Sequence, residues 1–247
     1  MIILREYHEY KSEYGFIVSQ IVKLLDIALE VIEDYMCGYI ELEINREIKL
    51  SPRECALSFS RRDLEERVRE ERLELDHIVR LGITRVSRDS IKRIFEKAYR
   101  YLLEDLNRVA EKYLVLTRER DREFLGVLFR DGTWLFLEGE RRDITIPRVS
   151  EESIAIVHTH PSDLCIASRE DLESTLDLFV SGGFLSAVIS YKCVFIMRLI
   201  DLFSEDCYIE FMKYINNYEY FLSTVSEVIR SGSRDMTCFR FEILSLS

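Results

Sequence analysis

Apolar segments of strand length alternate with helical segments from residue 83 onward, and this alternation most constrains the fold. SIAIVHTH (residues 153–160) is an apolar run of strand length that ends in two histidines. A helix is predicted to open at Ser168 and to close at a Gly-Gly pair, after which LSAVISY and CVFIMRLID are predicted as two more strands. Strands and helices that mix in this way predict an α/β fold class.

The neighbouring segments continue the same pattern. Their apolar spacing predicts helices over 89–114 and 205–230 and strands over 83–87, 123–129, 133–139 and 237–245. Ser87 or Ser90 is expected to cap the first of these helices. Arg130-Asp131-Gly132, between two predicted strands, is a sequence typical of a hairpin turn.

The first 82 residues are predicted to be mainly helical. Apolar side chains between residues 15 and 36 recur at helical spacing and form one wide face, and a densely charged helix is predicted over 60–82. Residues 39–50 alternate apolar and polar side chains, as in a short hairpin. We therefore expect an accessory region over 1–82, for dimerisation, substrate selection or covering of a site, ahead of a second domain over 83–247.

Charge and hydropathy exclude some classes of function. The net charge of −11 at pH 7 argues against a general nucleic-acid binder, although it leaves room for a local basic patch. The charged N-terminus lacks a segment typical of a signal peptide. Glycines and Lys192 divide the apolar run from Phe179 to Met197 into pieces of strand length, so we expect no membrane span and a cytoplasmic protein.

The cysteines and amides bear on the source of the chain. Six cysteines are scattered without a CxxC pair, which predicts neither a disulfide framework nor a zinc ribbon. Glutamine and asparagine are scarce while Glu, Arg and Lys are abundant, a bias associated with thermophiles. We expect a thermophilic archaeal source, in whose cells an intracellular disulfide is compatible with the compartment.

Two of the four histidines and one aspartate predict a metal site. His158 and His160 are two residues apart on a predicted strand, so their side chains point the same way, and Asp171 follows eleven residues later. Two imidazoles and one carboxylate suit zinc and leave a fourth position open, as in catalytic sites. The other histidines, His8 and His77, lie upstream, so binuclear hydrolases that need further downstream histidines lack their ligands here.

The segment HTHPSDLCIASRED resembles the signature of the JAMM (MPN-plus) zinc metalloproteases. That signature is His-x-His-Pro, six residues, Ser, two residues and Asp, and it is matched by His158, His160, Pro161, Ser168 and Asp171. Five specified residues at this spacing arise by chance about once in ten thousand chains of this length. The resemblance covers roughly residues 83–200, as the core of a catalytic domain over 83–247, and implies a mixed sheet flanked by helices.

The resemblance also implies roles for individual residues. His158, His160 and Asp171 would hold zinc, and Ser168 would donate a hydrogen bond to the oxyanion of a tetrahedral intermediate. Glu123, in a Glu-x-x-Gly-x-Leu context, would be the general acid/base. Chemistry alone does not choose it among the nearby acidic residues Glu138 (the runner-up), Glu140, Glu151 and Glu152. The implied reaction is hydrolysis of the peptide or isopeptide bond after the C-terminal glycine of a ubiquitin-like or sulfur-carrier protein.

Other interpretations stay open at this point. Ser168 and Asp171 also form a capping box and could be helix caps alone. Cys165 is expected to be a loop residue, with a metal ligand or redox-sensitive thiol as the alternative. The chain could be a non-catalytic MPN scaffold that binds partners, or a RadC-like protein, although residues 1–80 lack the Gly-rich DNA-binding region of that family.

Overall fold

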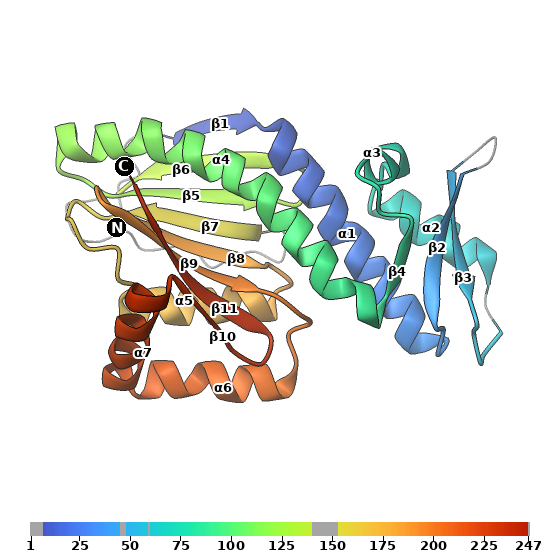
Figure 1. The fold of residues 1–247 in the computed structure, drawn as a ribbon. Helices are drawn as coiled ribbons and strands as arrows, with labels where there is room; N and C mark the ends of the chain where they lie inside the picture. Colours follow the sequence, from blue (N-terminus) through green and yellow to red (C-terminus); the bar gives the residue numbers. More distant parts are fainter. Residues whose placement is uncertain (1–6, 45–47, 59, 140–152, 247) are drawn as a thin grey trace. The chain divides into compact units, whose positions relative to one another are not determined.

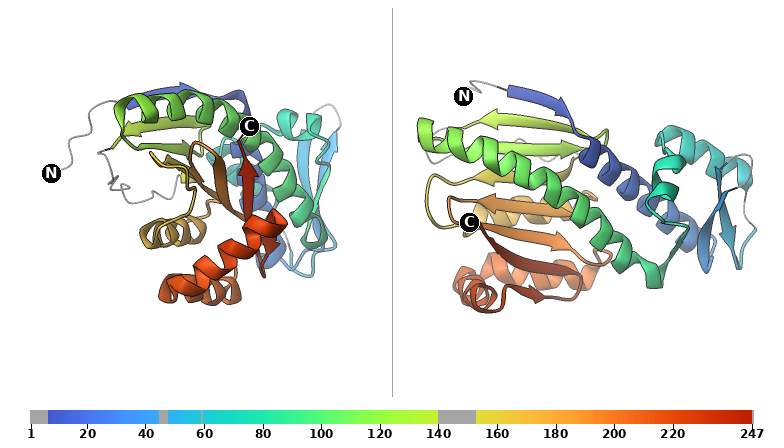
Figure 2. Two further views of the ribbon diagram at one scale, coloured as in Figure 1. Left: turned by 60° about the vertical axis from the view of Figure 1, so that its left-hand side comes forward. Right: turned by 45° about the horizontal axis from the view of Figure 1, so that its top comes forward.

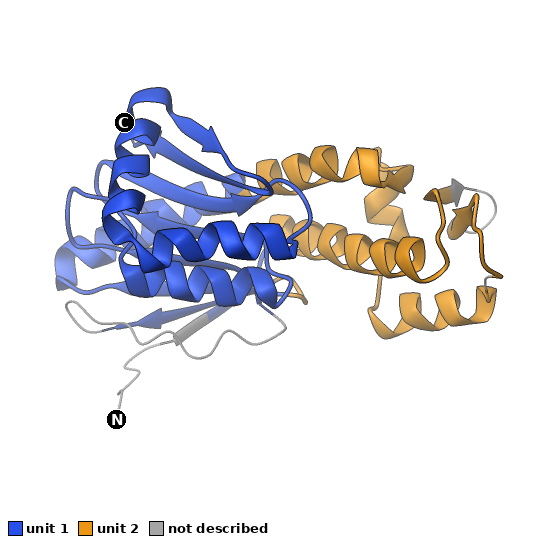
Figure 3. Ribbon diagram, turned by 90° about the horizontal axis from the view of Figure 1, so that it is seen from below, with its two compact units in different colours: residues 1–12, 103–129, 133–247 blue, residues 13–102, 130–132 orange. Residues whose placement is uncertain are grey.

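The computed structural model describes residues 7–44, 48–58, 60–139 and 153–246. The chain divides into two compact units (Figure 3). Unit 1 comprises residues 1–12, 103–129 and 133–247, and unit 2 comprises residues 13–102 and 130–132. The predicted boundary at residue 82 does not coincide with this division.

A mixed sheet forms the centre of unit 1, and its strands run in the order β1-β6-β5-β7-β8-β9-β11-β10 among the described residues. The strands are β1 (Tyr7–Lys11), β5 (Phe124–Phe129), β6 (Thr133–Glu138), β7 (Ser153–Thr159), β8 (Leu185–Ile189), β9 (Cys193–Leu199), β10 (Ser233–Asp235) and β11 (Phe239–Ser245). Neighbours are antiparallel except β7 and β8, which are parallel and are connected through α5 (Arg169–Val180). The sheet confirms the α/β class.

Helices cover both faces of this sheet (Figures 1 and 2). The unit 1 part of α4 (Ile91–Arg120) lies on one face, where the ring of Tyr113 stacks on Phe136 at 4.1 Å between centroids. On the other face lie α5, α6 (Glu205–Asn216) and α7 (Tyr218–Ser231). There Leu178 of α5 joins a buried cluster of side chains from β5, β6 and β7.

The strands that lead to the histidines are buried and closely packed. Every residue of β7 is buried, which explains its continuous apolar run. Gly126 of β5 faces it, and a Cβ at that position would lie 2.4 Å from the Phe136 ring and 2.9 Å from Val157. The glycine of the Glu-x-x-Gly sequence is therefore required by packing between β5, β6 and β7.

Unit 2 combines helices with a small antiparallel sheet in the order β3-β2-β4. Its elements are α1 (Glu13–Asp34), β2 (Tyr39–Ile44), β3 (Ile48–Arg53), α2 (Arg61–Glu70), α3 (Leu75–Arg80), β4 (Arg85–Ser87), the 3-10 turn η1 (Arg88–Ser90) and the first part of α4. The apolar face of α1 is buried, as its spacing predicts, and the hairpin β2–β3 is confirmed, although its turn residues lie outside the described part.

Two predicted helices are each divided in the structure. The helix predicted over 60–82 ends at Glu70 and resumes at Leu75, because Arg72 adopts a positive φ of 52° that turns the chain and Leu73 becomes buried. The helix predicted over 205–230 breaks at Asn217, which leaves helical geometry and accepts a hydrogen bond from the Tyr220 N–H at 3.1 Å. Asparagine favours such caps because its side chain competes for backbone groups.

Three further findings complete the comparison with the sequence. The strands β1 and β10 were not predicted.

All six cysteines are paired, as Cys37–Cys55, Cys165–Cys193 and Cys207–Cys238, so the expectation of no disulfide framework is wrong. Among the described residues no helix has the length and apolar character needed to cross a membrane, and the apolar run from Phe179 to Met197 ends α5 and forms β8 and most of β9.

Candidate metal centre

The two histidines lie at the end of β7, and their orientation is set from the opposite face of the sheet. Thr159 stands between them, and its hydroxyl lies 2.6 Å from the hydroxyl of Thr117 in α4 and accepts the Phe124 N–H at 2.9 Å. Because side chains alternate along a strand, fixing Thr159 toward α4 directs His158 and His160 toward the α5 face. The His160 N–H donates to the Ile189 carbonyl at 2.8 Å, which holds its backbone to β8.

The third residue is delivered by the start of α5. Ser168 is the N-cap, and its N–H donates to Asp171 Oδ2 at 2.6 Å while the Asp171 N–H donates to Ser168 Oγ at 3.1 Å. This is the predicted capping box. It fixes the carboxylate of Asp171 and leaves Oδ1 directed at His158, so capping and ligation are compatible roles for the same pair.

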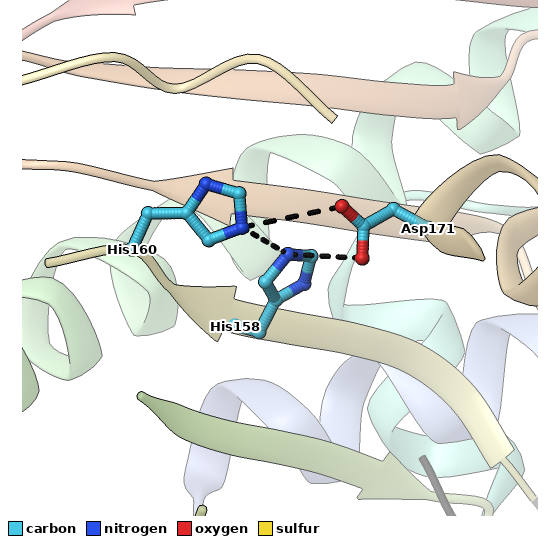
Figure 4. Close-up of side chains that lie close together, drawn as sticks. All are labelled: His158, His160 and Asp171. Atoms are coloured by element: carbon cyan, nitrogen blue, oxygen red, sulfur yellow. Dashed lines mark hydrogen bonds and ion pairs between the residues drawn. The ribbon is translucent and has the colours of Figure 1, made fainter. Parts of the chain in front are cut away.

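The three side chains converge on one point (Figure 4). His158 Nε2 lies 3.1 Å from His160 Nε2 and 3.2 Å from Asp171 Oδ1, and His160 Nε2 lies 4.0 Å from Asp171 Oδ2. A tetrahedral zinc site with bonds of about 2.0–2.1 Å has donor–donor separations of about 3.3–3.4 Å. The two separations from His158 Nε2 are close to that value, and the separation between His160 and Asp171 exceeds it, so the donor set suits zinc and the three side chains are near enough to share one ion.

The contacts between the ring atoms favour ligation through Nε2. The Nε2 atom of His160 faces His158 Nε2 and Asp171 Oδ2. The Nε2 atom of His158 faces only the other two members of the group. Its Nδ1 atom is buried and has no hydrogen-bond partner among the described residues.

Burial and neighbouring charges shift the pKa values of the group in different directions. Burial disfavours the charged form of His158, but the Asp171 carboxylate and, less strongly, Glu123 outweigh it and raise the pKa of His158. Burial together with the adjacent His158 lowers the pKa of His160 to about 4. Burial opposes ionisation of Asp171, yet His158 and the hydrogen bonds from Ser168 hold its pKa well below the usual range. The carboxylate is therefore ionised and available as a ligand.

Contacts along its length tether the loop from Pro161 to Ser168 to neighbouring elements. The Tyr191 N–H donates to the Ser162 carbonyl at 3.3 Å, Lys192 pairs with Asp163, Cys165 is disulfide-bonded to Cys193, and the Tyr218 hydroxyl donates to the Ala167 carbonyl at 2.7 Å. Cys165 is a loop residue, as predicted, and in the disulfide it is not a metal ligand; its redox sensitivity stays a prediction. Tyr218, from α7, was not predicted as a site residue, because no local pattern links it to the loop.

The register of β5 and β7 places Glu123 beside the histidines. Leu125 is paired with His158, and continuing this antiparallel register by two residues sets Glu123 opposite His160, on the same face of the sheet. Glu123 is also one of the charges that raise the pKa of His158. Both observations put its carboxylate near the three side chains of the candidate site.

The runner-up, Glu138, is engaged elsewhere. It is paired with Phe124, one residue from Leu125, so it points to the opposite face of the sheet. There it is 6% exposed and forms ion pairs with Arg120 at 2.5 Å and Arg122 at 3.3 Å. Glu140, Glu151 and Glu152 lie outside the described residues. His77 lies in unit 2 beside Glu74, and the His8 side chain is outside the described part.

No model of a known protein family matches the chain, and no curated protein is significantly similar to it in sequence. The short signature and the geometry of the site therefore carry the functional argument.

Proposed function

We propose that the chain is a JAMM-type zinc metallopeptidase that hydrolyses the peptide or isopeptide bond after the C-terminal glycine of a ubiquitin-like protein. The observation that carries the proposal is the convergence of two imidazoles and one carboxylate from His158, His160 and Asp171 at separations suited to zinc. The mixed sheet with helices on both faces is compatible with the JAMM fold that the signature implies. Homodimerisation and the accessory role of residues 1–82 stay predictions.

In this proposal each residue has one task. His158, His160 and Asp171 would hold the metal, and zinc bound there would supply a Lewis acid that polarises the scissile carbonyl and lowers the pKa of a water molecule. Glu123 takes the proton of the attacking water and returns it to the leaving amine. Its partly exposed position beside His160 is suited to a group that must contact both solvent and substrate.

Ser168 acts at the carbonyl oxygen of the substrate. Its Oγ atom accepts the Asp171 N–H, which fixes the position of the hydroxyl at the rim of the site, and the hydroxyl retains a proton to donate. A donor that meets the developing oxyanion contributes about 2.7–4 kcal/mol to catalysis in comparable sites. The substrate tail, a flexible C-terminus ending in glycine, would bind extended, with main-chain hydrogen bonds supplying affinity.

Glu123→Gln tests the assignment of the general base. The substitution keeps the size of the side chain but removes its basicity, so turnover should fall by about 10²–10⁴-fold while zinc content is unchanged. The assay is cleavage of a ubiquitin-like protein whose C-terminal glycine is joined to a fluorogenic amine, with chelator-treated enzyme as the blank.

Glu138→Gln is the matched control. It removes the same charge from the opposite face of the sheet, so turnover should be retained while thermal stability falls, because the ion pairs of Arg120 and Arg122 with this carboxylate are lost. If Glu138→Gln abolishes turnover in a folded protein and Glu123→Gln does not, the base role passes to Glu138.

A further inference from the structure

A cavity of about 550 Å³ lies within unit 2, between β4 and the first turns of α4. Its lining comes from residues 82–97, the segment in which β4 leads through η1 into α4 (Figure 1). Cavities of about 300–1,000 Å³ are typical of small-molecule sites. No residue of the candidate metal centre lines it, so it is a second candidate site.

The charge of the cavity is opposite to that of the chain. Arg85, Arg93 and Lys97 line it, against the single carboxylate of Asp89. Arg93 and Lys97 are one turn apart on α4, so both extend from the same face of the helix. The chain as a whole has a net charge of −11, which does not exclude a local basic patch, and these three cations form such a patch.

None of these three cations forms an ion pair with a described residue. The Arg85 guanidinium lies over the Tyr39 ring at 3.5 Å, Lys97 donates to the Leu81 carbonyl, and Arg93 makes no contact of these kinds with the described part of the chain. Other arginines of unit 2 do find carboxylates, in the pairs Arg53–Glu41, Arg61–Glu65, Arg67–Glu30 and Arg88–Glu33. Some other arginines of unit 2, Arg62 among them, also lack an ion pair with a described residue, so the distinguishing feature of the cavity is that three cations line it against one carboxylate.

The other lining residues suit a ligand that has both an anionic group and an apolar group. The hydroxyls of Thr84 and Ser87 supply polar groups. The Ser90 hydroxyl is used within the capping box that opens η1, where it accepts the Ser87 N–H and donates to the Ser87 carbonyl. The positive end of the long helix α4 adds to the potential of the cations. Ile83 and Ile94 provide apolar wall.

We propose that this cavity binds a small organic phosphate with two or more phosphate groups, the class to which nucleoside diphosphates belong. Three cations exceed what one phosphate needs, and guanidinium groups contact phosphate oxygens in bidentate fashion. The volume and the apolar wall leave space for an organic moiety beyond the phosphates.

Isothermal titration calorimetry on the full chain tests the site, with ADP, pyrophosphate and inorganic phosphate as separate ligands at low ionic strength. Wild type should bind ADP more tightly than pyrophosphate, and pyrophosphate more tightly than phosphate. Arg93→Ala should weaken ADP binding by about tenfold or more, the loss expected for one charge-assisted contact, and Arg93→Lys should recover part of it. Circular dichroism checks that the variants fold, as the exposure of Arg93 predicts.

Arg62→Ala is the matched control, because Arg62 is another exposed arginine of unit 2 without a partner in the described residues, and it lies on α2 outside the cavity. It should leave ADP binding unchanged. Equal losses in Arg62→Ala and Arg93→Ala would overturn the site, as would no ADP binding at millimolar concentration. Equal affinity for pyrophosphate and ADP would overturn the organic part of the assignment. If the chain binds polyglutamate but not ADP, the proposal of a small organic phosphate is wrong, and the ligand is an acidic protein segment.

Discussion

At the scale of single residues, Ser168 combines a structural and a proposed catalytic contact that two substitutions can separate. Ser168→Ala removes the N-cap of α5 and should cost about 1 kcal/mol of stability, whereas Ser168→Gly should cost only a few tenths. Both remove the hydroxyl, so both should lower kcat by about 10²–10³-fold if it meets the oxyanion. Thermal unfolding and turnover, measured side by side, provide the test. Activity that follows stability, with the glycine variant nearly unimpaired, would leave Ser168 a cap alone.

The members of the candidate site differ in how far the sequence identifies them. His158 and His160 follow from the period of a strand, and Asp171 follows from the capping pattern of a helix, so local rules reach all three. Glu123 and Glu138 are both acidic residues near the ends of predicted strands, and no local rule separates them. What distinguishes Glu123 from Glu138 is the pairing of β5 with β7 and the ion pairs with the arginines near the end of α4. Both are features of the tertiary structure.

At the scale of elements, the loop between β7 and α5 depends on its disulfide to β9. The double variant Cys165→Ser/Cys193→Ser should lose about 2–4 kcal/mol of stability and should bind zinc more weakly, because the loop carries His160 at one end and Ser168 at the other. Denaturant unfolding and zinc titration of the folded variant measure the two effects.

A second disulfide variant controls for stability. Cys37→Ser/Cys55→Ser removes a cross-link in unit 2 and should lower stability while zinc affinity stays at the wild-type value. Equal zinc affinities in both double variants would show that the Cys165–Cys193 bond does not support the metal site.

The sequence predicts strands well where burial on both faces gives a continuous apolar run, and it predicts turns poorly where distant packing decides them. The strands from β5 to β9 were found from apolar runs because the sheet is covered on both faces. The sequence does not predict the helix breaks at Arg72 and Asn217, because the apolar residues before and after each break recur at helical spacing. Strand β1 was missed because its identity rests on pairing with β6, more than a hundred residues away in the chain.

At the scale of the whole molecule, the chain brings together residues from distant segments that no local window contains. Strand β1 belongs to unit 1 although it precedes all of unit 2, and α4 contributes residues to both units. The three disulfides add cross-links in each unit. Disulfides form in oxidising compartments and also inside cells of hyperthermophiles, so they are compatible with the thermophilic source that the composition predicts.

The measurement that tests the central claim most directly is the zinc content of the purified chain by elemental mass spectrometry, beside Asp171→Ala and Asp163→Ala. Asp163 is an exposed carboxylate in the same loop, paired with Lys192 rather than with the histidines. We predict about one zinc ion per chain in wild type and in Asp163→Ala, and its loss in Asp171→Ala. Absence of zinc from wild type after reconstitution, or equal content in all three proteins, would contradict the account, and absence would favour the non-catalytic scaffold.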